Sequence, residues 1–234
     1  MVVAEKYNMV VAEKYNNLAA GYDDDYTSDL CRAEERELVR LLDDRIHTAG
    51  RIVDAGCGTG LLLDLFPTIP NYMGLDVSQG MLKKLKEKHP GRAVEHVDAW
   101  AWGHQLAEHV VSLFGSPSYN PIDEVIKGVR HHLGRNPDGT THRHGYGGKF
   151  TLMPYAHGRY RTAWQFNNKV SLHSNLWYTY GAAQWRRNLI EAGARDVEVR
   201  GFSLLGSSKL LRWESPLARR FPDRCQYLFI TGVM

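Results

Sequence analysis

Three glycines and the carboxylate before them are the residues of this sequence whose spacing best suits ligand binding. Gly56, Gly58 and Gly60 occupy alternate positions after Asp54, between a short apolar run at 52–53 and a leucine-rich segment. Because glycine has no Cβ, such a loop can turn tightly and bring its backbone close to a ligand. The helix that follows offers unpaired N–H groups to an electron-rich group.

The spacing of this loop argues against a dinucleotide ligand. Dinucleotide-binding loops follow the pattern G-x-G-x-x-G, whereas this loop is G-x-G-x-G. The charge of Asp54 would repel a bound pyrophosphate, but it would favour the ammonium group of an amino acid. The spacing and the charge of this loop therefore indicate a ligand other than a dinucleotide.

Two further carboxylates stand at the ends of the next two predicted strands. Asp76 ends the apolar stretch 71–77, at the spacing of about 20 residues where an acid meets ribose hydroxyls. A carboxylate can accept hydrogen bonds from both the 2′- and the 3′-hydroxyl. Asp98 follows the third strand, 93–97, and Trp100 lies just beyond it. Core or interface packing is the ordinary role of such a tryptophan, and the place of Trp100 just past a strand end strengthens the case for a role in the site.

Strands and helices alternate along most of the chain, which predicts an α/β fold. A doubly wound parallel sheet binds ligands at the carboxyl ends of its strands. The apolar segment 110–114 is typical of a central strand covered on both faces. In the predicted helix 31–44, residues 34–37 are expected on the solvated face. The remaining predicted strands are 149–153, 196–202 and 226–233, and the remaining helices are 78–89, 122–133 and 183–192.

The composition is that of a globular protein with one substantial core: 234 residues, 43% hydrophobic and 24% charged. The net charge of +3 is too small to indicate a nucleic-acid partner by itself. Three cysteines without metal-like spacing favour a reducing, cytoplasmic setting. No apolar run approaches the roughly 20 residues that span a bilayer, and the start does not resemble a signal peptide. We therefore expect a cytoplasmic protein without a membrane segment.

Two regions depart from the alternating pattern. The octapeptide MVVAEKYN occupies residues 1–8 and again 9–16. Such a short perfect repeat is expected to be an artefact or disordered, which leaves 17–234 as one domain. Residues 154–180 form an insertion rich in aromatic and basic side chains. The insertion could cover a substrate pocket, stack nucleic-acid bases or add a strand pair to the sheet.

Four histidines invite a metal hypothesis: His131, His132, His142 and His144. Their spacing fits no standard zinc pattern, and no cysteine is close to them in the sequence. We therefore expect no metal site.

The three strand ends together resemble the class I S-adenosylmethionine-dependent methyltransferases. The resemblance runs through residues 53–60, 74–78 and 97–100 in the family's order and spacing, and it covers about 20–153 well. It implies a three-layer αβα, Rossmann-like, doubly wound sheet of seven strands in the order 3-2-1-4-5-7-6, with strand 7 antiparallel. It also implies S-adenosylmethionine as the cofactor, with S-adenosylhomocysteine as the product.

The resemblance assigns each part of the cofactor to a strand end. The glycine loop would hold the methionine part, Asp76 the ribose hydroxyls, and Asp98 with Ala99 the adenine edge. Residues 114–116 would lie beside the sulfonium. The full set of expected cofactor-binding residues is Tyr22, Asp54, Ala55, Gly56, Cys57, Gly58, Gly60, Asp76, Val77, Met81, Asp98, Ala99, Trp100, Phe114, Gly115 and Ser116.

The resemblance also implies a mechanism. A sulfonium methyl group is already electrophilic, so such an enzyme chiefly aligns a nucleophile with the S–CH₃ bond and excludes water. A general base helps when the acceptor is protonated. Tyr119 and His157 are the two candidate catalytic residues.

The segment Ser-Pro-Ser-Tyr at 116–119 bears on the methyl acceptor. It is similar to the Asp/Asn/Ser-Pro-Pro-aromatic motif of amino-group DNA methyltransferases, but Ser118 replaces the second proline. The chain shows no evident target-recognition domain and no strong positive charge, and no Pro-Cys pair suited to cytosine C5 chemistry follows the fourth strand. We therefore favour an O or N nucleophile of a small molecule. Amino-group methylation of a nucleic-acid base is the first alternative, and a non-catalytic S-adenosylmethionine-binding module is the second.

Overall fold

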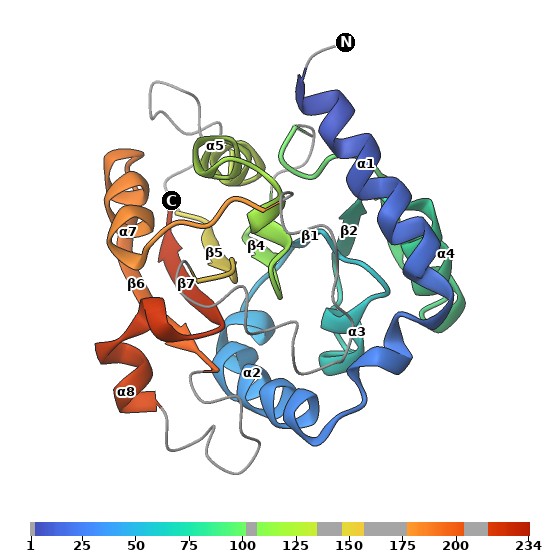
Figure 1. Ribbon diagram of the computed structural model, residues 1–234, viewed down its shortest axis with the longest axis horizontal. Helices are drawn as coiled ribbons and strands as arrows, with labels where there is room; N and C mark the ends of the chain where they lie inside the picture. Colours follow the sequence, from blue (N-terminus) through green and yellow to red (C-terminus); the bar gives the residue numbers. More distant parts are fainter. Residues whose placement is uncertain (1–2, 102–106, 135–146, 157–176, 204–214) are drawn as a thin grey trace.

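The computed structural model describes residues 3–101, 107–134, 147–156, 177–203 and 215–234. The strands are β1 (Ile52–Ala55), β2 (Tyr72–Asp76), β3 (Ala93–His96), β4 (His109–Ser112), β5 (Lys149–Leu152), β6 (Arg195–Phe202) and β7 (Tyr227–Val233). They form one sheet in the order β3-β2-β1-β4-β5-β7-β6 (Figure 1). β1 to β5 run parallel, and β7 is antiparallel to both β5 and β6. The predicted sheet order is confirmed, including the antiparallel strand 7.

Helices cover both faces of this sheet. They are α1 (Val3–Leu18), α2 (Asp29–His47), α3 (Leu61–Leu65), α4 (Gln79–Lys88), α5 (Ile122–His132), α7 (Ala182–Glu191) and α8 (Ser215–Arg220), with 3₁₀ turns η1 (Ala19–Gly21), η2 (Asp23–Tyr26), η3 (Ser116–Tyr119) and η5 (Pro222–Arg224). Neighbouring residues of a strand point to opposite faces, so Ile52 packs with α2, α3 and α4 while Val53 packs with α5 and α7. This is the predicted three-layer αβα arrangement. Within the described ranges, no helix is long and apolar enough to cross a membrane.

Serine caps set where two helices near the glycine loop begin. Ser28 Oγ accepts a hydrogen bond from the N–H of Cys31 at the start of α2, and Ser78 Oγ accepts one from the N–H of Met81 at the start of α4, each at 3.2 Å. Such caps satisfy backbone donors that have no partner inside the helix. Because Ser78 lies two residues beyond Asp76, the cap also places the start of α4 at the end of β2.

The expectation that residues 9–16 are disordered is wrong, because they belong to α1. Asn16 Oδ1 accepts hydrogen bonds from Ser78 Oγ and from the N–H of Gly80, both at 2.8 Å. A Cβ at Gly80 would lie 3.1 Å from Asn16 Cα, so the absence of a side chain there lets α1 pack closely on α4. The second copy of the repeat is therefore docked on the fold.

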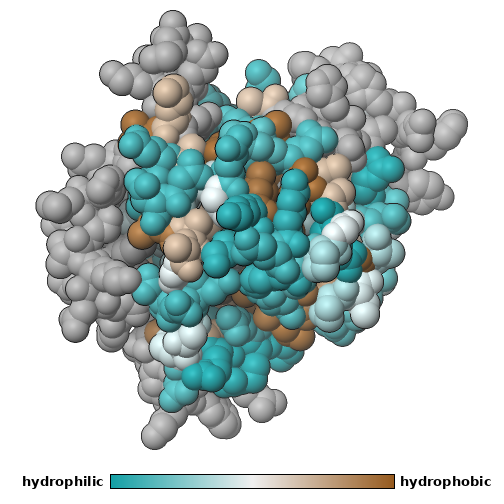
Figure 2. All heavy atoms as spheres, turned by 90° about the vertical axis from the view of Figure 1, so that its right-hand side faces the viewer, coloured by the Kyte–Doolittle hydropathy of each residue, from teal (hydrophilic) through white to brown (hydrophobic). Residues whose placement is uncertain are grey.

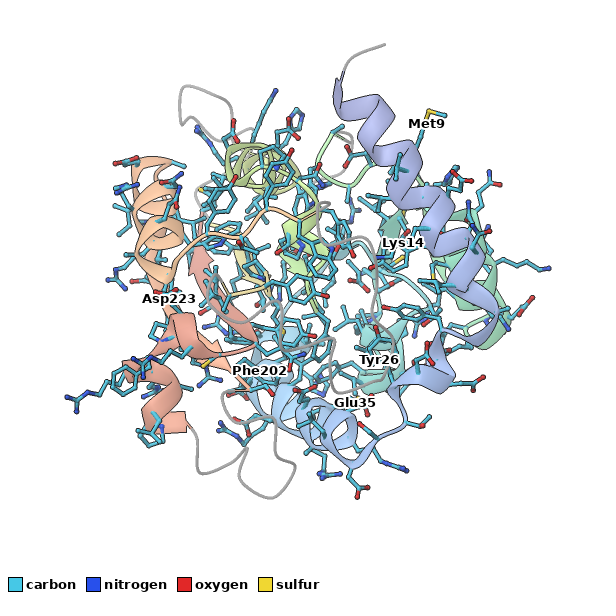
Figure 3. All side chains as sticks on the ribbon, viewed as in Figure 1. Met9, Lys14, Tyr26, Glu35, Phe202 and Asp223 are labelled. Atoms are coloured by element: carbon cyan, nitrogen blue, oxygen red, sulfur yellow. The ribbon has the colours of Figure 1, made fainter. Side chains whose placement is uncertain are left out.

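The two sides of α1 differ in their surroundings. The outer face of the molecule on the side of α1 and α4 is mostly hydrophilic, with scattered hydrophobic side chains (Figure 2). Met9 is 62% exposed and points away from the molecule, whereas Lys14 points inward (Figure 3). The inner side of α1 is therefore the side available to the cavity described below.

Part of the aromatic-rich insertion lies outside the described residues, namely 157–176. At its described ends, Tyr155 pairs with Tyr227 and Ala156 with Tyr180 in isolated β-bridges. His142 and His144 of the metal hypothesis also lie outside the described residues.

Candidate functional site

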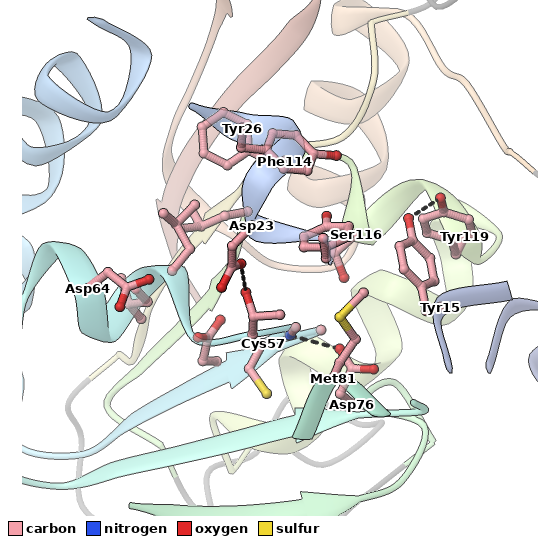
Figure 4. A pocket seen from close by; sticks show the side chains of 18 of the residues that line it. Tyr15, Asp23, Tyr26, Cys57, Asp64, Asp76, Met81, Phe114, Ser116 and Tyr119 are labelled. Atoms are coloured by element: carbon pink, nitrogen blue, oxygen red, sulfur yellow. Dashed lines mark hydrogen bonds between the residues drawn. The ribbon is translucent and has the colours of Figure 1, made fainter. Parts of the chain in front are cut away.

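A cavity of about 560 Å³ opens where β1, β2 and β4 end side by side (Figure 4). It is lined by the glycine loop, by the chain after β2, β3 and β4, and by the segment that joins α1 to α2. Ala55, Gly60 and Gly115 do not line it. The expected cofactor-binding residues that do are Tyr22, Asp54, Gly56, Cys57, Gly58, Asp76, Val77, Met81, Asp98, Ala99, Trp100, Phe114 and Ser116.

The glycine loop has a left-handed backbone at all three glycines. The angle φ is +76° at Gly56, +53° at Gly58 and +96° at Gly60, a region that other residues rarely adopt. A Cβ at Gly56 would collide with Ser116 Oγ, whereas a Cβ at Gly58 would meet nothing within 4 Å. Because Gly58 lines the cavity, its bare backbone leaves room for a ligand.

Asp76 holds the glycine loop and the start of α4 together. Its Oδ2 accepts from the N–H of Gly58 at 2.9 Å, and its Oδ1 accepts from the N–H of Ser78 at 2.8 Å. Burial raises the pKa of Asp76, and these two backbone donors oppose that rise. A carboxylate has about four acceptor positions, so Asp76 keeps capacity to accept from a ligand hydroxyl.

Asp54 lies at the base of the loop and is 3% exposed. Its Oδ2 accepts a hydrogen bond from Tyr72 Oη at 2.9 Å. Burial raises the pKa of Asp54 to about 7, the hydrogen bond from Tyr72 lowers it, and the charge of Asp76 raises it further. The carboxyl group therefore exchanges between its neutral and ionised forms at neutral pH, and a ligand ammonium would favour the ionised form.

Tyr72 is a site residue that the sequence analysis missed. The hydroxyl of Tyr72 reaches Asp54 because Gly74 has no side chain. Gly74 lies two residues after Tyr72 on β2 and pairs with Asp54 of β1. A Cβ at Gly74 would lie 2.8 Å from Tyr72 Oη and 2.9 Å from Cys57 Sγ. A glycine inside a strand, which often marks a close approach, is the only signal that could have found this contact.

The turn after β3 is fixed by one carboxylate and one histidine. Asp98 Oδ1 accepts from the N–H of Trp100 at 2.9 Å, and His132 Nε2 donates to the carbonyl of Ala99 at 2.6 Å. A Cβ at Gly128 would lie 2.9 Å from Trp100 Cα, so α5 packs directly on this turn. His132, part of the metal hypothesis, thus positions the segment expected to bind adenine. The described residues contain no group of three side chains suited to a metal ion.

The chain after β4 is strained where it faces the glycine loop. Phe114 has φ +43°, and Gly115 follows at +84°. A non-glycine residue in this region costs on the order of 1–3 kcal/mol and is typical of functional sites. Ser116 Oγ donates to the carbonyl of Ala55 at 3.2 Å, which ties this turn to the end of β1. Phe114 and Ser116 both line the cavity.

Of the two candidate catalytic residues, only Tyr119 lies among the described residues. Tyr119 lines the cavity from η3, and its hydroxyl lies 2.5 Å from that of Tyr15. Burial raises the pKa of Tyr119 to about 12, so its hydroxyl keeps the proton at neutral pH and is not suited to act as a general base. His157 lies outside the described residues.

Of the side of the cavity formed by α1, η2 and α2, the sequence analysis assigned only Tyr22 to the site. Tyr15, Tyr26 and Glu34 line it, and Thr59 Oγ1 donates to Asp23 Oδ1 at 2.5 Å between the glycine loop and η2 (Figure 4). The prediction of a solvated face at Glu34 is wrong, because this side chain is 5% exposed. The reason is that α2 borders both the sheet and the cavity, so less of its circumference meets water.

No protein-family model matches the sequence, and the comparison with curated proteins finds no match either. Among solved structures, a possible histamine N-methyltransferase from Thermotoga maritima aligns with a TM-score of 0.67 at 11% identity, over 95% of this chain and 98% of that one. The fold is that of the S-adenosylmethionine-dependent methyltransferases.

Other structures with the methyltransferase fold carry the cofactor or its product. A magnesium protoporphyrin IX methyltransferase from Synechocystis PCC 6803, with bound S-adenosylhomocysteine, aligns with a TM-score of 0.62 at 16% identity over 96% of this chain and 98% of that one. An amino pentose methyltransferase of calicheamicin biosynthesis from Micromonospora echinaspora, with bound S-adenosylmethionine, aligns with a TM-score of 0.56 at 15% identity over 92% and 95%. The likeness extends along nearly the whole length of each chain.

Proposed function

We propose that this protein is an S-adenosylmethionine-dependent methyltransferase that transfers a methyl group to an oxygen or nitrogen atom of a small molecule. The observation that carries the proposal is the convergence on one cavity of the open backbone at Gly58, the carboxylates of Asp54 and Asp76, and the turn at Asp98. The methyltransferase fold supports it, because ligands of such sheets bind at the carboxyl ends of the strands.

The chemistry of these residues fits the parts of S-adenosylmethionine. Asp54 would bind the ammonium group, and Asp76 would accept hydrogen bonds from the ribose hydroxyls. The turn from Asp98 to Trp100, which His132 holds in place, would bind the adenine edge. When bound, the cofactor supplies an electrophilic methyl group.

The chain's own residues would then align the acceptor and exclude water. Phe114 and Ser116 line the cavity next to the glycine loop, where the resemblance places the sulfonium. The rings of Tyr22 and Tyr26, with centroids 4.9 Å apart, border the cavity from the segment before α2. Orientation and exclusion of water are the main requirements for transfer from a methyl group that is already reactive.

Several observations support a small-molecule acceptor. The aromatic side chains around the cavity suit a buried organic molecule. The net charge of +3 is too small to indicate a nucleic-acid partner. Structures with this fold include enzymes named for a magnesium porphyrin and for an amino pentose. Cys31, Cys57 and Cys225 form no disulfide bond, which supports the cytoplasm as the place of action.

Calorimetry with S-adenosylmethionine and S-adenosylhomocysteine, followed by a radiolabelled-methyl transfer screen against pools of small molecules, tests the proposal. We expect binding of both ligands and transfer to at least one pool. Binding without transfer to any pool would favour a non-catalytic module. Salt-dependent binding of DNA or tRNA with transfer to its bases would favour the nucleic-acid alternative.

A further inference from the structure

Asn120 is a buried polar residue at the wall of the cavity. It lies between η3 and α5, borders the cavity and is 8% exposed. Asp54 of the same wall is also buried, and it bonds to Tyr72. Thr59 is likewise buried and bonds to Asp23. The amide group of Asn120, in contrast, forms no hydrogen bond within the part of the chain that the structure describes.

An amide group in such a place suits a ligand. A buried polar side chain without a hydrogen bond costs free energy, so native proteins rarely contain one. Neither amide atom of Asn120 belongs to the fully buried polar atoms that lack a partner, so both keep surface that a small molecule can reach. An asparagine amide combines an acceptor, Oδ1, with a donor, Nδ2. The ligand group that satisfies Asn120 therefore presents a donor beside an acceptor.

The local sequence fixes the backbone of Asn120. Its φ of −130° and ψ of 154° are extended, and the proline that follows confines the preceding residue to this region. The carbonyl of Pro121 accepts from the N–H of Val125 at 3.1 Å, which begins α5 directly after Asn120. The position of Asn120 is therefore set by the start of this helix.

Helix α5 brings Asn120 to the side of the cavity where the turn after β3 lies. The helix packs directly on this turn, because a Cβ at Gly128 would lie 2.9 Å from Trp100 Cα. Burial raises the pKa of Glu124, and the charges of two acids, one of which is Asp98, raise it further. The first turn of α5 is therefore within electrostatic range of Asp98. The proposed function assigns the turn after β3 to adenine, so Asn120 borders the adenine end of the cavity.

Adenine presents the hydrogen-bonding pattern that this amide requires. Its amino group is a donor, and a ring nitrogen that accepts, N1 or N7, stands on either side of it. An asparagine amide pairs with the amino group and N7 together when proteins read adenine in nucleic acids. Because the amino group has two hydrogens, Asp98 and Ala99 can bind the N1 side while Asn120 binds the N7 side.

We propose that Asn120 recognises the adenine of S-adenosylmethionine, with Oδ1 accepting from the amino group and Nδ2 donating to N7. The inference rests on the proposed function and adds a specificity-determining residue to its cofactor site. A purine with an oxygen in place of the amino group would put two acceptors, that oxygen and N7, against the amide, and Oδ1 would lose its donor. Asn120 thus selects adenine among the purines.

Matched ligands test this inference by calorimetry on the full chain. S-adenosylhomocysteine would be compared with its 7-deaza analogue, in which a C–H group replaces N7, and with its 1-deaza analogue, in which a C–H group replaces N1. Asn120→Leu keeps a side chain of similar size and removes both hydrogen-bonding atoms. Asn17→Leu is the control, because Asn17 is an exposed asparagine that does not line the cavity.

We expect the unmodified protein to bind the 7-deaza analogue about tenfold more weakly than S-adenosylhomocysteine, because Nδ2 of Asn120 loses its acceptor. Asn120→Leu should bind S-adenosylhomocysteine roughly 10- to 100-fold more weakly and should bind the 7-deaza analogue equally well within about twofold. The affinity ratio for the 1-deaza analogue should be the same in both proteins. Asn17→Leu should behave as the unmodified protein. A purely structural role of Asn120 would lower all affinities together and leave every ratio unchanged.

Two kinds of result would overturn the inference, and they can be told apart. Equal binding of S-adenosylhomocysteine and its 7-deaza analogue by the unmodified protein, or a difference that Asn120→Leu preserves, would refute the role of Asn120 but keep the cofactor site. No binding of S-adenosylhomocysteine to the unmodified protein would refute the proposed function and this inference with it. If Asn120→Leu does not fold, Asn120→Ala removes the same two atoms and allows the same comparison.

Discussion

The hydroxyl oxygens of Tyr15 and Tyr119 lie 2.5 Å apart and join α1 to the turn after β4 at the wall of the cavity. The two rings also pack edge to face, with centroids 5.7 Å apart, and the ring of Tyr22 lies 6.0 Å from that of Tyr15. Tyr15 belongs to the second copy of MVVAEKYN. A repeated segment therefore contributes to the wall of the candidate site.

The hydrogen bond between Tyr15 and Tyr119 should couple the two residues in stability. Tyr15→Phe and Tyr119→Phe each keep the ring and should each lower the free energy of unfolding by about 1 kcal/mol. The double variant should lose little more than either single one, because both remove the same bond. Urea unfolding of the four proteins checks this, and strictly additive losses would contradict a direct bond between the hydroxyls.

Asp76→Ala should weaken binding of S-adenosylmethionine. The variant loses the acceptor of the ribose hydroxyls and also the bonds from Gly58 and Ser78, so we expect a loss of about 1.5–3 kcal/mol. That corresponds to roughly 10- to 100-fold in affinity by calorimetry. Asp123→Asn, an exposed acid in the first turn of α5, is the control. Unchanged affinity in Asp76→Ala would remove the ribose assignment.

The sequence predicts the strands of the sheet well because most of them contain runs of apolar residues, and a glycine or an acid stands at or just beyond the end of β1, β2 and β3. Backbone features such as the glycine loop can also be read from residue types, since few residues adopt a left-handed backbone. The contact of Tyr15 could not be predicted, because only the packing of two elements brings its partners together, and Gly74 is the only sequence signal for the contact of Tyr72. Glu34 was misplaced for a similar reason: helical periodicity separates two faces, whereas α2 borders sheet, cavity and solvent.

The raised pKa of Asp54 should make the stability of the cofactor-free protein depend on pH. A carboxyl whose pKa is about 7 in the folded state and about 4 when unfolded binds its proton more tightly in the folded protein. Its contribution to stability is therefore fully present below about pH 4 and is lost as the pH rises through about 7. Asp54→Asn should flatten the curve of unfolding free energy against pH in this window. A curve of the same slope in Asp54→Asn would place the titration on another group.

Binding of S-adenosylmethionine should depend on the same group with the opposite sign. The cofactor ammonium favours the ionised form of Asp54, so affinity should rise with pH through about 7. Between pH 6 and pH 8 the ionised fraction of such a group changes about tenfold, and the dissociation constant should fall by up to this factor. Calorimetry at several pH values checks it, with Asp54→Asn expected to bind weakly and without this dependence. Equal affinity at pH 6 and pH 8 in the unmodified protein would contradict an ammonium site at Asp54.

Substitutions at two glycines can distinguish the backbone strain that a new side chain causes from the effect of that side chain on the cavity. Gly58 and Gly91 have φ of +53° and +84°, and a Cβ at either would meet nothing within 4 Å. Only Gly58 lines the cavity. Gly58→Val and Gly91→Val should therefore each lower the free energy of unfolding by about 1–2 kcal/mol, the cost of a left-handed backbone for a residue with a Cβ.

The effects of the two variants on the cofactor should differ. Gly58→Val places a branched side chain where the methionine part of S-adenosylmethionine would lie, so we expect affinity to fall at least about 100-fold. Gly91→Val should keep the affinity within about twofold, because its new side chain points away from the cavity into solvent. Thermal unfolding and calorimetry on both proteins provide the measurements. Normal binding by a folded Gly58→Val protein would mean that the cofactor does not approach this loop. Gly91→Val is the control, because it introduces comparable backbone strain away from the cavity.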